Sequence, residues 1–156
     1  MYGDLSHLDS DARACATLIE AIAPFLSSIK QWALARQVPT VEVVETPKAD
    51  LAFRFLDSQF LITHEFVGGC RERTLKCEMA RYGRYDTALG SPLSNLTWDV
   101  YSISNRVDFR YLNQPLNASS AFNDLFPVFL SDLLWPATAT KDWGERTGKV
   151  REFYRR

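Results

Sequence analysis

The spacing of the apolar residues changes near residue 37 of this chain, and that change restricts the possible folds. Before it, apolar side chains recur three and four positions apart, which is the spacing of one helix face. These side chains stand at positions 15, 18, 19, 22, 25, 26, 29, 32 and 33. After it, apolar and polar residues alternate, as they do in a half-buried strand. We therefore expect a long helix followed by a sheet.

The expected helix starts at capping residues and continues past a proline. Asp9, Ser10 and Asp11 precede the apolar stripe, and Ser and Asp are favoured N-cap residues. Pro24 lies inside the stripe, but the apolar spacing keeps its phase across it. We therefore expect a kink at this proline rather than the end of the helix.

Four strands are expected between residues 38 and 82. The first three cover 40–45, 51–56 and 59–67. A two-residue turn at Asp57-Ser58 would pair Phe55 with Phe60 and Phe53 with Ile62, so that the large residues share one face.

The fourth segment, 71–82, follows a second hairpin signal at Gly68-Gly69. That hairpin would place Ile62 beside Leu75, but it would also set Glu65 opposite Glu72, which is unfavourable. A short helix ending at Gly83 is the alternative for this segment, and we favour the strand.

A further hairpin and a helix complete the pattern. Strands 96–103 and 106–112 flank Ser104-Asn105, and this turn pairs Val100 with Phe109 and Asp99 with Arg110. The apolar spacing then returns to that of a helix, which begins near residue 117 or 124 and ends before residue 136.

This order of elements predicts a single α+β domain over residues 1–135 and a polar, basic tail over 136–156. An antiparallel hairpin meander of five to six strands should pack one face against the long N-terminal helix and the C-terminal helix. The other face should be solvated or form a contact surface. It would carry Arg54, Thr63, Glu65, Thr97, Asp99, Tyr101, Asp108 and Arg110.

Charge and cysteine content exclude several classes of protein. The 18 basic and 19 acidic side chains leave a net charge of −1, whereas a dedicated DNA-binding domain has a strongly basic face. No uninterrupted apolar run reaches the roughly 18 residues that span a bilayer, so we expect no membrane contact. Cys15, Cys70 and Cys77 form an odd set without a signal peptide, which predicts free thiols and a cytoplasmic location.

The residues suited to catalysis are few. Of the two histidines, His7 lies in the terminal segment and His64 shares a strand face with Phe60 and Ile62. Glu65 follows His64 directly, but neighbours on a strand point to opposite faces and cannot form a dyad. The cysteines are too far apart for a zinc site, so we expect neither a metal nor another cofactor. A small enzyme with a site near His64 is our third hypothesis.

Arginine and tyrosine alternate in the segment 71–85. Such side chains can bind a phosphate backbone and stack on bases, so RNA or DNA binding by this segment and the basic tail is the second hypothesis. Glu72, Glu78 and Asp86 dilute the positive charge there, and a solvated strand has the same composition.

Our first hypothesis is a non-catalytic protein that masks or occludes a partner protein, as inhibitors, immunity proteins and secretion chaperones do. Tyrosine and arginine are enriched at protein interfaces. The chain could also pair with itself. The candidate contact residues are Arg54, Arg71, Arg73, Arg81, Tyr82, Arg84, Tyr85, Asp99, Tyr101 and Arg110.

The order of elements resembles small secretion-chaperone-like folds over Leu51 to Phe66 and Val107 to Trp135. The resemblance implies partner binding across a sheet and dimerisation. The basic tail and the hairpin at Gly68-Gly69 depart from that pattern. A likeness at the level of the fold does not by itself assign a function.

Overall fold

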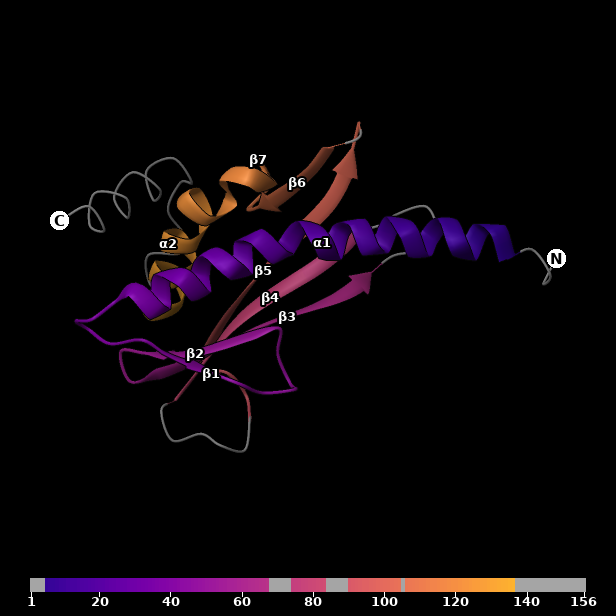
Figure 1. Cartoon of the computed structure of the whole chain (residues 1–156). Coiled ribbons are helices and arrows are strands. Elements are labelled where there is room, and N and C mark those ends of the chain that lie inside the picture. Colours follow the sequence, from indigo (N-terminus) through magenta and orange to yellow (C-terminus); the bar gives the residue numbers. More distant parts are fainter. Residues whose placement is uncertain (1–4, 68–73, 84–89, 105, 137–156) are drawn as a thin grey trace.

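Seven antiparallel strands form one sheet in the order of the sequence, and two helices lie on the same side of it (Figure 1). The computed structural model describes residues 5–67, 74–83, 90–104 and 106–136. This arrangement confirms the α+β meander, and its seven strands exceed the five to six expected. The elements are α1 (Leu5–Ala35), β1 (Glu42–Val44), β2 (Leu51–Phe55), β3 (Ser58–Val67), β4 (Thr74–Gly83), β5 (Ser94–Ile103), β6 (Arg106–Tyr111), β7 (Gln114–Asn117), a 3₁₀ turn (Ala118–Ser120) and α2 (Ala121–Leu134).

The turn between β2 and β3 lies one residue earlier than predicted. Leu56 and Asp57 have positive φ angles of 49° and 59°, as the two central residues of a type I′ hairpin require. Phe53 therefore pairs with Phe60, and the predicted pairing of Phe55 with Phe60 is wrong. The shift in pairing is two residues, an even number, so every side chain keeps its predicted face.

The predicted register between β3 and β4 is also wrong, although the strand itself is confirmed. Phe66 pairs with Leu75, and Ile62 lies beside Met79. Glu65 faces Lys76 instead of the expected glutamate, so opposite charges meet. The Gly68-Gly69 signal and the tail after residue 136 lie outside the described residues.

The β5–β6 hairpin has the predicted register, with Val100 opposite Phe109. Another tight turn follows β6, at Leu112 and Asn113, which have φ angles of 51° and 63°. It adds the strand β7, which was not expected. Pro115 is compatible with this strand because β7 is at the edge of the sheet. Asn117 then caps the 3₁₀ turn by accepting a hydrogen bond from the amide of Ser119 at 2.9 Å.

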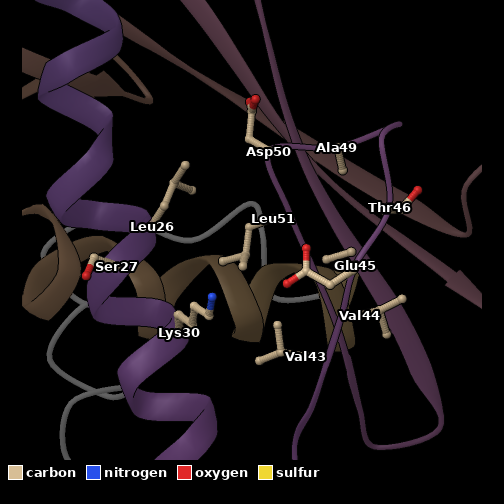
Figure 2. Close-up of a pocket in the computed structure, with 11 residues that line it drawn as sticks. Leu26, Ser27, Lys30, Val43, Val44, Glu45, Thr46, Ala49, Asp50 and Leu51 are labelled. Carbon is tan, nitrogen blue, oxygen red and sulfur yellow. The ribbon is translucent and has the colours of Figure 1, made fainter.

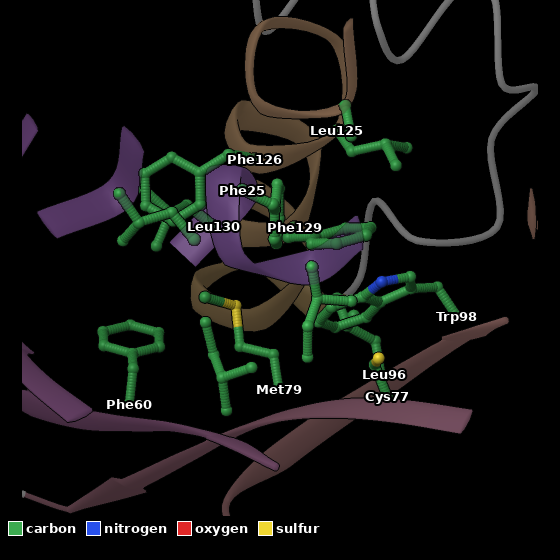
Figure 3. Packing of buried hydrophobic residues seen from close by; sticks show 14 of the residues in the cluster. Phe25, Phe60, Cys77, Met79, Leu96, Trp98, Leu125, Phe126, Phe129 and Leu130 are labelled. Atoms are coloured by element: carbon green, nitrogen blue, oxygen red, sulfur yellow. The ribbon is translucent and has the colours of Figure 1, made fainter. Parts of the chain in front are cut away.

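The core lies between the two helices and the face of the sheet that they cover. Phe25 of α1 is at its centre, with its ring 5.7 Å from that of Trp98, 5.5 Å from Phe109 and 6.2 Å from Phe129. Figure 3 shows the side chains of α2 and the sheet converging on the same space. Such edge-to-face aromatic contacts contribute beyond the area they bury.

By length and mean hydropathy alone, the stretch Leu8–Ala35 of α1 would suffice to cross a membrane. Polar residues interrupt this stretch, so the sequence alone did not predict a membrane span. Core helices of soluble proteins and signal sequences meet the same criterion. In this structure Leu18, Ile22 and Ile29 are buried, and α1 packs on the sheet and α2.

Candidate functional site

The face of the sheet opposite the helices, here called the open face, carries the candidate site. Figure 1 shows α1 and α2 on the other side of the sheet. Because strand residues alternate, the residues that lie between those facing the helices project onto the open face. In the centre of that face Glu65, Lys76, Asp99 and Arg110 are paired in sequence across β3, β4, β5 and β6.

Three of the residues predicted as contacts are brought together at one end of this row. The Arg110 guanidinium donates to Asp99 Oδ2 at 3.1 Å, and its central carbon lies 4.9 Å from the ring centre of Tyr101. The ion pair is partly exposed, with side-chain exposures of 44% for Arg110 and 30% for Asp99. The carboxylate and the ring therefore hold a guanidinium at the surface in one orientation.

Asp108 belongs to the open face, as predicted, but it is not a surface residue. Its side chain is only 4% exposed, and Oδ2 accepts a hydrogen bond from Arg106 at 2.9 Å. Its other carboxylate oxygen is buried with no hydrogen-bond partner in the described part of the chain. Asp108 is the cross-strand partner of Tyr101 and so belongs to the Tyr101 end of the face.

A shallow hollow of about 620 Å³ lies beside this cluster. Mostly polar side chains of three neighbouring strands line it, and one of them, Glu78, accepts a hydrogen bond at Oε2 from Asn95 at 3.1 Å. A wide, polar depression of this kind suits a protein side chain better than an apolar small molecule, which prefers an enclosed pocket. Its lining residues are Thr63, His64, Glu65, Val67, Lys76, Glu78 and Thr97.

The remaining predicted contacts are dispersed. Arg54 lies at the other end of the open face, 3.6 Å from Glu42, and Tyr82 stands in the same cross-strand row. Arg81 projects to the helix-covered face, where it donates to Ser58 Oγ at 2.7 Å and to the carbonyl of Leu133 at 3.3 Å. Arg81 therefore links β4 to the end of α2. Arg71, Arg73, Arg84 and Tyr85 lie outside the described residues.

His64 has a partner, Asp50, that the sequence did not predict. Asp50 directly precedes β2 and places its carboxylate 2.5 Å from His64 Nδ1. The side chain of Asp50 is 28% exposed and that of His64 is 24% exposed, so water reaches the pair. An acidic residue 14 positions away gives no local signal of such a contact, because only the β2–β3 register brings it close.

Cys77, opposite His64 on β4, is unsuited to nucleophilic chemistry. Burial raises the pKa of its thiol from 9.0 to about 12, and the nearby carboxylates of Asp50 and Asp99 act in the same direction. The thiolate is the reactive form of cysteine, so this side chain is inert at neutral pH. Within the ranges that the structure describes, no three His, Cys, Asp or Glu side chains are grouped to hold a metal ion.

Alkylation should detect this burial directly. At pH 8 we expect iodoacetamide to modify Cys77 at least 100-fold more slowly in the folded protein than in urea, followed by mass spectrometry of its peptide. The thiol also favours folding at ordinary pH. Because its pKa is higher in the folded state, this contribution is present below pH 9 and is lost as the pH rises toward 12. Rapid alkylation of the folded protein would contradict the burial.

A second hollow of about 220 Å³ lies between α1 and the β1–β2 connection. Lys30 of α1 and Glu45 extend toward one another across its opening, and Asp50 lies at its rim (Figure 2). Aliphatic side chains of Leu26, Val43 and Leu51 form much of the remaining lining. It is smaller than the pockets that ordinarily hold a drug-sized ligand.

No family model matches the chain, and neither a curated protein nor a solved structure was found to be similar to it. The resemblance to secretion-chaperone-like folds therefore depends on the order of elements alone. Any function must be inferred from the site itself.

Proposed function

We propose that this chain is a non-catalytic protein-binding domain that masks or occludes its partner through the open face of its sheet. The observation that carries this proposal is the guanidinium of Arg110, held between Asp99 and the Tyr101 ring beside the shallow polar hollow. Arginine and tyrosine fixed in one orientation lose little entropy on binding, and both are frequent anchors of protein interfaces.

Charge distribution favours a protein partner over nucleic acid. Arg54, Arg106 and Arg110 each lie within 4 Å of a carboxylate, at 3.6, 2.9 and 3.1 Å. A surface that binds phosphates leaves its cations unneutralised, because affinity comes from replacing the counterions of the nucleic acid. Arg81, a member of the basic segment, is engaged with Ser58 and Leu133 instead.

The described residues also favour binding over catalysis. Asp50 and His64 supply an orienting carboxylate and a base, but a hydrolytic site of this type also needs an activated nucleophile. Cys77, the cysteine paired with His64 on the neighbouring strand, stays protonated to about pH 12. We therefore assign a structural role to the contact between Asp50 and His64, which joins the start of β2 to β3.

Affinity capture with matched variants tests the proposal. The bait would be the full chain, and the test variant Tyr101→Ala/Arg110→Ala removes both anchors from the open face. We expect this variant to bind a stoichiometric captured protein at least tenfold more weakly, since interface anchors each contribute about 2 kcal/mol. The control Glu20→Ala/Gln31→Ala changes two exposed residues of α1 and should leave capture unchanged.

Two results would contradict the proposal. Full binding by the Tyr101→Ala/Arg110→Ala variant would show that the open face is not the contact. Loss of all captured material after nuclease treatment, with affinity that falls steeply with added salt, would favour the nucleic-acid hypothesis instead.

A further inference from the structure

The central row of the open face alternates in charge across four adjacent strands. Glu65 pairs with Lys76, Lys76 with Asp99, and Asp99 with Arg110. Glu65, Lys76 and Arg110 are exposed and Asp99 is partly exposed, so the row is available for contact. It contains two acids and two bases in the order negative, positive, negative, positive.

A row with this order is complementary to itself under one particular symmetry. Consider a second copy stacked face to face, with a two-fold axis parallel to the strands and passing between β4 and β5. Glu65 then faces Arg110 of the second copy, Lys76 faces Asp99 of the second copy, and symmetry repeats both contacts. Two sheets packed in this way keep their strands nearly aligned, which is the common geometry of sheet stacking.

Another axis gives the opposite result. Consider instead a two-fold axis that lies between the two sheets and runs along the row, perpendicular to the strands. It would place each charged residue of the row opposite its own copy. Four like-charge contacts would follow, and these are strongly unfavourable in an interface. The order of charges therefore selects the axis parallel to the strands.

The two neighbouring rows agree with this axis. Glu78, which pairs with Thr97 on β5, would face Thr97 of the second copy, a hydrogen-bond donor for its carboxylate. Thr74, which pairs with Tyr101, would face Tyr101 of the second copy. Neither row brings like charges together, and the tyrosine supplies an aromatic ring near the axis.

We propose that the protein bound by the open face is a second copy of this chain, in a face-to-face dimer about the axis between β4 and β5. This inference rests on the proposed function and specifies the partner. Its interface is polar and its charges are partly exposed, so the dimer should dissociate as salt is added.

Charge reversal with complementation tests the geometry. Glu65→Arg and Arg110→Glu each place like charges opposite one another at both ends of the row. In sedimentation equilibrium we expect each variant alone to raise the dimer Kd at least tenfold. An equimolar mixture of the two variants should restore dimer formation to within about threefold of the wild type, because every contact of the mixed dimer is again complementary.

A reversal on the other side of the molecule provides the control. Arg13 is exposed and lies on α1, away from the open face. Arg13→Glu should leave the dimer Kd unchanged. If Glu65→Arg or Arg110→Glu fails to give a folded circular dichroism spectrum, Lys76→Glu and Asp99→Lys form an equivalent complementary pair at the centre of the row.

The outcomes separate this inference from the proposed function. A wild-type chain that stays monomeric at low salt overturns the dimer. The proposed function survives that result if Tyr101→Ala/Arg110→Ala still loses its captured protein. A dimer that is insensitive to the reversals, for example one formed by α1, also overturns this geometry. So does a mixture of variants that does not recover.

Discussion

Replacing Phe25 by alanine should lower the free energy of unfolding by about 4 kcal/mol, the largest single-residue effect that we expect in this protein. The Phe25 side chain is 2% exposed, and its ring contacts those of Trp98, Phe109 and Phe129. Alanine would remove three edge-to-face contacts and leave a cavity between α1, the sheet and α2. These surrounding elements are held by their own packing and cannot close the cavity fully.

Urea unfolding followed by tryptophan fluorescence would measure the loss, since Trp98 lies in the same cluster. Leu34→Ala provides the matched control, because Leu34 is also on α1 but is 70% exposed. It should change the free energy of unfolding by less than about 0.5 kcal/mol. A loss below about 1.5 kcal/mol for Phe25→Ala would contradict the central position of this ring.

Tyr111→Phe should destabilise the protein by about 2 kcal/mol through a buried polar contact. The Tyr111 hydroxyl donates to Asp132 Oδ2 at 2.5 Å and joins β6 to α2. Asp132 is 6% exposed, so its carboxylate cannot recover this hydrogen bond fully from water. Removing a donor from a buried charged acceptor costs more than removing one from a neutral group.

A double-mutant cycle isolates this contact. Tyr111→Phe, Asp132→Ala and the double variant would be unfolded in urea under identical conditions. We expect a coupling energy of at least 1 kcal/mol, because the second substitution then removes a carboxylate that has already lost this donor. Additive losses within about 0.3 kcal/mol would show that the contact does not stabilise the fold.

Local patterns in the sequence were sufficient for the architecture except for the edge strand β7. The change of apolar spacing near residue 37 and the return to helical spacing after the last hairpin located both helices and the meander. The periods of helix and strand differ, and each element must bury one face. The alternation of β2 and β3 also assigned the correct face to Phe53 and Phe60 although their pairing was mispredicted. An even shift in register does not exchange the faces of a strand.

Which cross-strand neighbours meet could be predicted only where a tight turn fixes the register. Asp99 and Arg110 were correctly paired because the connection between β5 and β6 is only two residues long. The pairing of Glu65 with Lys76 was missed, because the connection between β3 and β4 is six residues long and carries no strict length signal.

Contacts between residues far apart in the sequence were decided by the tertiary structure. Asp50 with His64, and Tyr111 with Asp132, are 14 and 21 residues apart, and local propensity does not encode such contacts. The alternating row of charges on the open face has the same origin. The sequence determined which face each side chain occupies, whereas the register of three successive hairpins decided which charges became neighbours.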